Sequence, residues 1–117
     1  MAKIEVTNNG ILIATLHGEL DNHEAKQIRS DISSSIFTGR VRAVIWNLEG
    51  LGFMDSAGIG LILGRMRDLA PLGGETLILN PSVTMEKIFG FSGLGENIRH
   101  CTVETAIGEI GGVVHEQ

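Results

Sequence analysis

Residues 43–48, AVIWNL, form a nearly continuous apolar run in the middle of the chain. Such a run is typical of a strand that is covered on both faces of a sheet, because the side chains on both faces must then be apolar. Residues 76–79 form a second, shorter run, and stretches of helical period follow both runs. Strands that alternate with helices predict parallel pairing through right-handed crossovers. We therefore expect an α/β fold.

The sheet is expected to start with a hairpin. Asn8-Asn9-Gly10 separates two short strand-like segments at residues 4–6 and 11–16. Asn-Gly between two such segments is the strongest short-range signal for a hairpin. Residues 98–101 are a candidate last strand. The prediction is a small mixed sheet, with an N-terminal antiparallel hairpin followed by parallel strands.

About four helices are expected to pack on this sheet, each identified by apolar residues at helical spacing. The first follows a loop at residues 18–22, is capped by Asp21 or Asn22, and ends at Gly39. The second follows the central strand and stops at Pro71, because proline does not continue a helix.

The third helix is predicted to begin with Asn80 as its N-cap and Pro81 at its first position. Thr102 is expected to cap the fourth. A chain of 117 residues suits one compact domain. We expect this domain to span residues 1–110 and a flexible tail to occupy residues 111–117.

Charge and composition narrow the possible functions. The formal net charge is −5, which argues against nucleic acid as a partner, because that binding depends on basic residues neutralising phosphates. No segment approaches the roughly 18 apolar residues of a membrane span, and the N-terminus lacks the apolar run of a signal peptide. Cys101 is the only cysteine, so the chain cannot form an internal disulfide or a thiolate zinc site. We expect a cytoplasmic protein without membrane contact.

The most informative stretch is residues 51–60, LGFMDSAGIG, between the central strand and the second helix. Three interpretations of Ser56 compete. In the first, Ser56 or Asp55 is simply the N-cap of the following helix. In the second, Ser56 is a catalytic nucleophile. In the third, Ser56 is a modification site.

A catalytic role for Ser56 has little support in the sequence. A nucleophile elbow needs glycine two residues before and two residues after the serine. Met54 occupies the first of these positions, and Gly58 occupies the second. The four histidines are scattered without the signature of a catalytic base, and no phosphate-binding Gly-Lys-Ser/Thr pattern is present at this turn. We therefore expect no enzyme activity, no catalytic residue, no metal and no cofactor.

Modification of Ser56 is compatible with helix physics. A phosphate at a helix start meets free backbone N–H groups and the positive end of the helix dipole. It adds about −1.5 to −2 charges. That charge would join the charge of Asp55 and repel a partner that docks an acidic or apolar surface there.

The helix after Ser56 is a candidate docking surface. At about 100° per residue, one apolar stripe is expected to face the sheet. It consists of Ile59, Ile62, Leu63, Met66 and Leu69. The residues expected to lie away from this stripe are Ala57, Gly60, Leu61 and Gly64, with Leu61 projecting. Residue types alone leave open whether this face binds a partner or is ordinary surface.

Three segments together carry a resemblance to a known family. They are Gly18-Glu19-Leu20-Asp21, Asn47-Leu48-Glu49 and residues 53–60. With this order and spacing, the sequence resembles the bacterial anti-sigma factor antagonists, which belong to the STAS domain class, and most of all those of the sporulation type. The resemblance runs from about residue 3 to about residue 110 without a large insertion.

This resemblance implies partner switching. An unphosphorylated antagonist of the family binds an anti-sigma factor that is also a serine kinase, and the sigma factor is freed. The kinase phosphorylates the motif serine and ejects the antagonist, and a serine phosphatase restores it. Ser56 would be the phosphoacceptor, Asp55 and Gly58 would shape the turn, and Asp21 would lie near Ser56 and contact a basic residue of the kinase. ATP and magnesium would belong to the kinase.

Ala57 departs from close relatives, which often carry a second hydroxyl residue there, and leaves Ser56 as the only acceptor in the motif. An alternative within the same family is a STAS interaction module of a transport or stress-signalling complex without a sigma-factor role. The pair Asp55-Ser56 makes that alternative less favoured, because a purely structural module needs no hydroxyl at this position.

Overall fold

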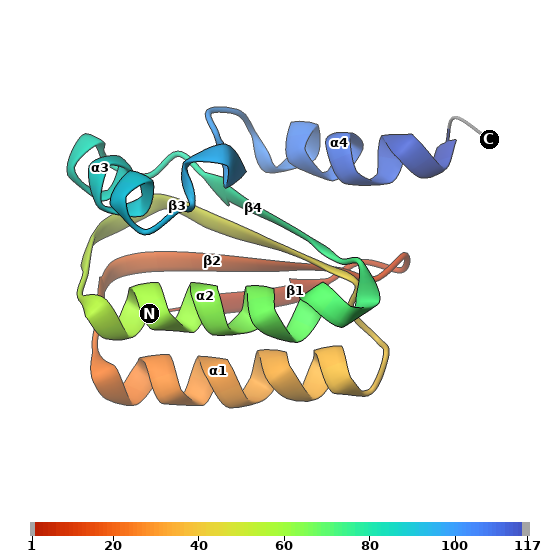
Figure 1. Ribbon diagram of the computed structural model, residues 1–117, viewed down its shortest axis with the longest axis horizontal. Helices are drawn as coiled ribbons and strands as arrows, with labels where there is room; N and C mark the ends of the chain where they lie inside the picture. Colours follow the sequence, from red (N-terminus) through yellow and green to blue (C-terminus); the bar gives the residue numbers. More distant parts are fainter. Residues whose placement is uncertain (1, 116–117) are drawn as a thin grey trace.

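The computed structural model describes the backbone of residues 2–115 and the side chains of residues 2–111. Within this part of the chain, strands and helices alternate (Figure 1). In chain order the elements are β1 (Ala2–Val6), β2 (Ile11–Leu20), α1 (Asn22–Phe37), β3 (Ala43–Met54), α2 (Ser56–Leu69), β4 (Glu75–Leu79), α3 (Val83–Phe91), β5 (Ile98–Arg99) and α4 (Val103–His115). Short 3₁₀ turns, Ala70–Leu72 and Gly95–Asn97, precede β4 and β5.

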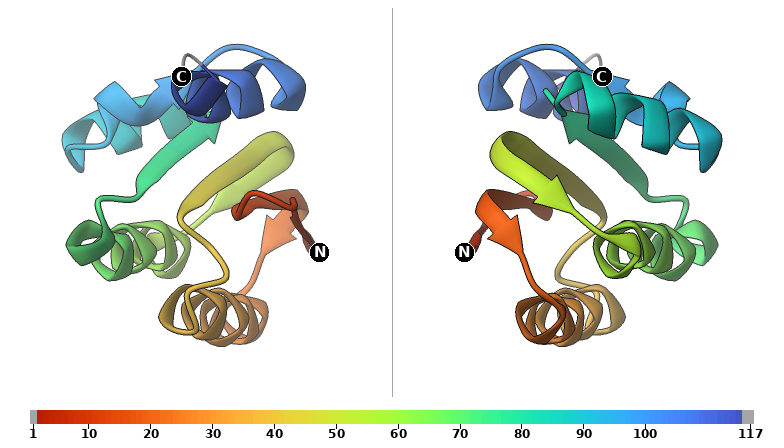
Figure 2. Two further views of the ribbon diagram at one scale, coloured as in Figure 1. Left: turned by 90° about the vertical axis from the view of Figure 1, so that its right-hand side faces the viewer. Right: turned by 90° about the vertical axis from the view of Figure 1, so that its left-hand side faces the viewer.

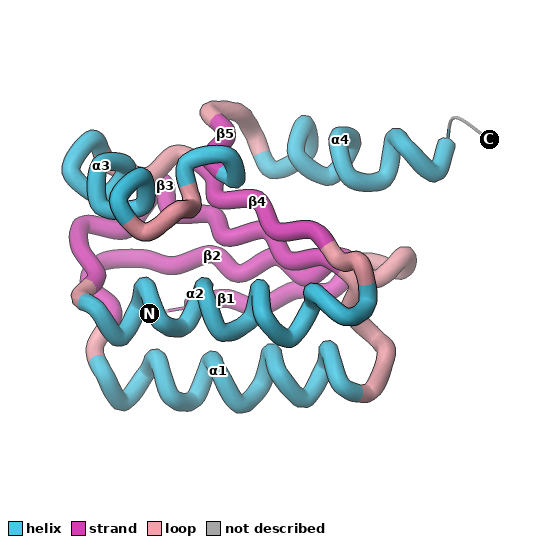
Figure 3. Tube along the Cα trace, in the orientation of Figure 1, coloured by secondary structure: helices cyan, strands magenta, loops and turns pink. Residues whose placement is uncertain are grey.

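The strands form one mixed sheet in the order β1-β2-β3-β4-β5 (Figure 3). β1 is antiparallel to β2, and each later pair is parallel. Gly10, in the turn between β1 and β2, has a φ of 85°, a left-handed conformation that glycine adopts without strain. The predicted hairpin and the predicted parallel strands are both confirmed.

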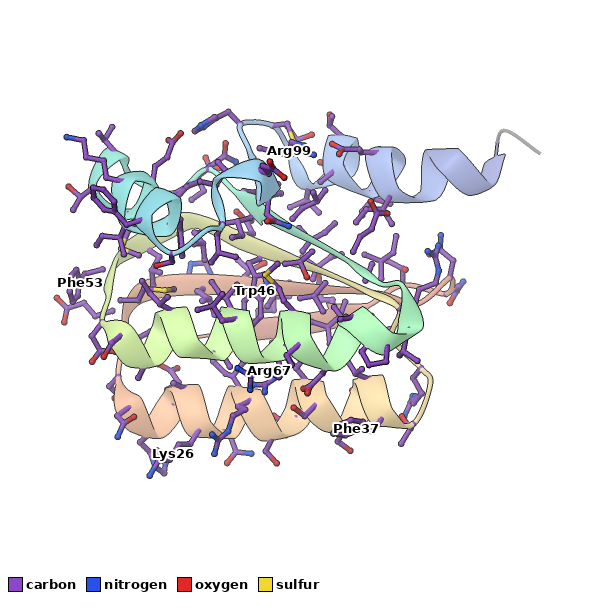
Figure 4. The ribbon with its side chains drawn as sticks, in the orientation of Figure 1. Lys26, Phe37, Trp46, Phe53, Arg67 and Arg99 are labelled. Atoms are coloured by element: carbon purple, nitrogen blue, oxygen red, sulfur yellow. The ribbon has the colours of Figure 1, made fainter. Side chains whose placement is uncertain are left out.

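Helices cover both faces of the sheet. α1 and α2 lie side by side on one face, and α4 lies on the other (Figures 1 and 2). In β3, Val44 and Trp46 are buried on the α1–α2 side, and Figure 4 labels Trp46 there. Ala43 and Ile45 are buried on the α4 side. The apolar run of β3 is therefore explained by burial on both faces.

β2 and β3 both run longer than expected. β2 includes residues 18–20, which were predicted to be part of a loop, and β3 continues beyond Leu48 to Met54. The two extensions pair with each other, with two register shifts, as far as Leu20 opposite Met54. These polar and glycine-rich stretches lack a clear alternating pattern, so the signal for a strand is weak even though their backbone groups are paired.

Aspartates cap the starts of α1 and α2. Asp21 Oδ1 accepts a hydrogen bond from the Glu24 N–H at 2.8 Å. Asp55 Oδ1 accepts one from the Ala57 N–H at 2.9 Å. Both aspartates have the extended backbone that an N-cap requires. Of the two capping candidates for α2, the structure therefore selects Asp55 and not Ser56.

The later helix starts agree only in part with the expectation. Thr102 caps α4 as predicted, through its Oγ1. α3 starts later than predicted, because Ser82 Oγ accepts from the Met85 N–H at 3.2 Å and is the cap in place of Asn80. The Asn80 amide instead donates from Nδ2 to the carbonyl of Cys101 at 2.8 Å, which ties the end of β4 to the segment after β5.

A flexible tail was expected at residues 111–117, and its flexibility stays a prediction. The backbone of α4 remains helical to His115. Gly111 is buried, and a Cβ at this position would lie 3.5 Å from Asn9 Nδ2, so this part of α4 packs beside the hairpin turn. Residues 116 and 117 lie outside the described residues.

α2 is rotated relative to the expected orientation. Leu61 is only 3% exposed and Gly64 is also buried, although both were expected on the outer face. Ile59, Leu63 and Met66, which were expected to face the sheet, are only half-buried. The reason is that α1 packs along α2 and covers a second side of it. The expected orientation considered only the sheet as the partner of α2, so it placed Leu61 and Gly64 on the outer face.

An ion pair with little exposure marks the contact between α1 and α2. Arg65 in α2 is 7% exposed, and its Nε lies 2.9 Å from Oδ2 of Asp68. The same oxygen accepts a hydrogen bond from Ser33 Oγ of α1 at 2.8 Å. Removing the carboxylate would leave a buried charge uncompensated, which typically costs about 3–5 kcal/mol. This network therefore fixes the position of α2 against α1.

Gly58 and Gly60 provide a matched pair of substitutions near the start of α2. A Cβ on Gly58 would lie 2.7 Å from the Cβ of Met54, whereas nothing lies within 4 Å of a Cβ on Gly60. We expect Gly58→Ala to destabilise the fold by about 1–3 kcal/mol, because the strand end must shift. Gly60→Ala should stabilise it by about 0.5–1 kcal/mol, because alanine favours the helix. Urea unfolding measures the free energy of unfolding of both variants. Changes of the same sign and size in the two variants would contradict the close approach of α2 to β3.

The caps provide a second comparison. Asp55→Ala should lower the free energy of unfolding by about 1 kcal/mol, because it removes the acceptor for the Ala57 N–H. Ser56→Ala should change it by less than about 0.5 kcal/mol, as is usual for an exposed side chain without a structural contact. The same urea titrations test this prediction. Equal losses for the two variants would mean that Ser56 shares the capping role.

Candidate functional site

Two helix N-termini meet at one edge of the sheet. Leu20 and Met54 are paired where β2 and β3 end, and Asp21 and Asp55 follow them directly. Figure 1 shows that α1 and α2 start side by side at this edge. Both carboxylates are exposed, and the positive ends of two helix dipoles lie behind them. The structure thus places Asp21 beside the start of α2, although it is 34 positions earlier in the chain than Asp55.

Ser56 is the first residue of α2, and its side chain is exposed. Asp55 already provides the cap, and within the described residues the Ser56 hydroxyl has no hydrogen-bond partner. No base is therefore bonded to this hydroxyl in the described part of the chain. The arrangement presents an unengaged hydroxyl to an incoming protein.

The outward side of α2 carries a surface that we call the Ser56 face. It consists of Ser56, Ile59, Gly60, Leu63 and Arg67. Ser56, Gly60 and Arg67 are exposed, and the two aliphatic side chains are half-buried. Because Gly60 has no side chain, another protein can approach the helix backbone closely there. Figure 4 labels Arg67 on this helix and Phe53, which is 52% exposed, just before its start.

The expected partner-binding residues divide into two groups. Asp21, Asp55, Ala57 and Gly60 have some exposure at or near the helix starts. Leu61 and Gly64 are buried on the side that faces α1, and Gly58 is buried against Met54. The prediction that Leu61 projects from the surface is wrong. Gly58 packs against Met54 and shapes the turn that precedes α2.

A groove runs between α1 and α2 and adjoins the Ser56 face. It has a volume of about 280 Å³. Its lining consists of Asn22, Ala25, Lys26, Arg29, Ala57, Gly60 and Leu61. Lys26 and Arg29 are exposed, and within the described residues neither forms an ion pair. The groove thus combines an apolar floor with two cationic side chains.

The sequence patterns did not predict this groove, although the sequence carries a signal for half of it. Asn22, Lys26 and Arg29 recur at intervals of four and three residues, so they share one side of α1. The other half depends on α2 lying alongside α1. That contact joins residues far apart in the chain, such as Ser33 and Asp68 at a separation of 35 positions, so no local pattern reports it.

Other features of the described residues point to no further centre. His100 Nε2 lies 3.2 Å from Oε1 of Glu86, which belongs to α3. Among the described residues, no three His, Cys, Asp or Glu side chains are grouped closely enough to hold a metal ion. None of the helices in the described part of the chain has the length and apolar character needed to cross a membrane.

Comparison with known proteins identifies the family. The STAS domain matches residues 3–110. The chain is 50% identical over 113 residues to the anti-sigma F factor antagonist of Lysinibacillus sphaericus, and the match covers 97% of each chain. This finding confirms the resemblance that the sequence motifs indicated.

Two solved structures are similar over almost the whole chain. The anti-sigma factor antagonist SpoIIAA in its unphosphorylated form matches with a TM-score of 0.91 and 47% identity, covering 96% of this chain and 97% of the other. The Bacillus cell fate determinant SpoIIAA in the phosphorylated form matches with a TM-score of 0.87 and 48% identity, covering 94% and 99%. The chain therefore belongs to the STAS domain family, among the anti-sigma factor antagonists.

Proposed function

We propose that this chain is an anti-sigma factor antagonist that works by partner switching, with Ser56 as its phosphoacceptor. One observation carries the proposal: Ser56 is exposed at the start of α2, and its hydroxyl is left unengaged because Asp55 takes the cap. In this role the unphosphorylated chain binds an anti-sigma factor through the Ser56 face and releases the sigma factor. Phosphorylation of Ser56 reverses the binding.

The physical basis of the switch is local charge. A phosphate on Ser56 adds about −1.5 to −2 charges next to Asp55 and close to Asp21. A docked protein would have to desolvate this charge beside the aliphatic side chains of Ile59 and Leu63, which is costly. The positive end of the α2 dipole favours the phosphate, so the fold itself tolerates the modification. The similarity of this chain to both the unphosphorylated and the phosphorylated relative supports a fold that does not change on phosphorylation.

The proposed chemistry is divided among three proteins. This chain supplies the Ser56 hydroxyl and a docking surface, and Asp21 contacts a basic residue of the kinase. The anti-sigma factor, acting as the serine kinase, brings ATP and magnesium. A serine phosphatase removes the phosphate. Because sigma factors act in the cytoplasm, the chain would work there, without binding nucleic acid or a membrane directly.

Binding to the purified anti-sigma factor of the same host tests the proposal. Wild type and Ser56→Ala should bind with similar affinity, because the neutral face is kept. Ser56→Asp should bind at least about tenfold more weakly, which corresponds to about 1.4 kcal/mol, because it places a negative charge on that face. Isothermal titration calorimetry measures the affinities, and circular dichroism checks that each variant is folded.

A phosphorylation assay provides the matched control for the acceptor. Ser82 is a suitable control because it is also an exposed serine at a helix start, as the cap of α3. With the kinase and ATP, wild type and Ser82→Ala should both incorporate phosphate. Ser56→Ala should incorporate none. Equal binding of Ser56→Asp and wild type, or continued phosphorylation of Ser56→Ala, would contradict the proposal and favour an interaction module of another assembly.

A further inference from the structure

The groove between α1 and α2 has a chemical character that the proposed switch does not use. The switch requires Ser56, its acidic neighbours and the Ser56 face of α2. The groove lies on the α1 side of that helix and presents Lys26 and Arg29. Figure 4 labels Lys26 on the N-terminal half of α1. The two cations therefore flank the same docking surface.

Lys26 and Arg29 are not neutralised by an ion pair among the described residues. Elsewhere in the described chain, Arg65 is paired with Asp68, and Arg99 is paired with Glu109. Lys26 and Arg29 have no such partner among the described residues, although the whole chain has a net charge of −5. Two unpaired cations beside an apolar floor are complementary to an anionic side chain with an aliphatic stem.

The size and the lining of the groove favour a side chain over a small molecule. A volume of about 280 Å³ is at or below the range of about 300–1,000 Å³ that is usual for small-molecule sites. Ala25, Ala57 and Leu61 form the apolar floor, which suits methylene groups. The Asn22 amide offers a hydrogen-bond donor. An arginine can bind a carboxylate through two parallel hydrogen bonds.

We propose that this groove receives a carboxylate side chain, aspartate or glutamate, of the anti-sigma factor, which pairs with Lys26 and Arg29. This inference rests on the proposed function and specifies the chemistry of its partner. The carboxylate fixes the orientation of the partner on the Ser56 face, because the groove lies on only one side of α2.

The arrangement also specifies the spacing of charges on the partner. Lys26 and Arg29 follow Asp21 by five and eight residues, which is about 7–12 Å along α1. The partner segment therefore presents a basic residue opposite Asp21 and an acidic residue about 7–12 Å from it. On a helix these two residues are about five to eight positions apart. A segment docked in the reverse direction would place like charges together.

Charge reversals test the inference with a control of equal net charge. Lys26→Glu and Arg29→Glu change the groove, whereas Lys87→Glu changes an exposed lysine on α3 by the same charge. Calorimetry with the purified anti-sigma factor should show each groove variant binding at least about tenfold more weakly than wild type, and Lys87→Glu binding within about twofold. The difference in affinity between wild type and the groove variants should shrink at high salt, because exposed ion pairs are screened.

A charge swap identifies the carboxylate. Reversal to lysine of one exposed aspartate or glutamate of the anti-sigma factor should weaken binding to wild type and restore binding to Lys26→Glu or Arg29→Glu. All three lysine and arginine variants alter exposed side chains, and unfolding in urea confirms that they remain folded.

The outcomes separate the two proposals. Groove variants that bind as well as Lys87→Glu, while Ser56→Asp fails to bind, would overturn the groove inference and leave the phosphorylation switch intact. Absence of any restoring charge swap would likewise overturn it. Binding of Ser56→Asp equal to wild type would overturn the proposed function, and with it the groove inference.

Discussion

The pairing of β2 with β3 as far as Leu20 opposite Met54 is the constraint on which the site depends. Because parallel strands end at the same edge of a sheet, the helices that follow them start at the same edge. Asp21 and Asp55 each cap one of these helices. A strand ending several residues earlier would separate the two caps and leave Ser56 without its acidic neighbour from α1. The unusual length of two irregular strands thus brings the two caps and the exposed Ser56 hydroxyl to one place.

The second constraint is the contact between α1 and α2. It is made by small and aliphatic residues on α2 and by the network of Arg65, Asp68 and Ser33. This contact rotates α2 so that Leu61 is buried and Leu63 is only half-buried. The same contact creates the groove. Packing between the helices therefore determines which side chains a partner meets, in addition to stabilising the domain.

Much of the fold follows from local patterns. The apolar run around Trp46 predicted the central strand, Asn-Gly predicted the hairpin, and Asp21 was one of two predicted caps. The predictions failed where one element depends on another that is distant in the chain. Residues 18–20 become a strand only because β3 pairs with them, and Leu61 is buried only because α1 lies beside it. Of the proposed site, Ser56 and both aspartates were predicted from the sequence and stay predictions as functional residues, whereas Lys26 and Arg29 were recognised only from the folded groove.

A surface switch requires that modification changes binding without unfolding the domain, and the distribution of charges in this chain meets that requirement. The buried pair of Arg65 and Asp68 lies on the α1 side of α2, whereas Ser56 points outward from the helix start. A phosphate there is favoured by the helix dipole by about 0.3–1 kcal/mol at an exposed position. The phosphate would not break an existing hydrogen bond of the Ser56 side chain, because this hydroxyl forms none among the described residues. In the proposed switch, the energetic cost of the added charge would therefore fall on the docked partner, which would have to desolvate it.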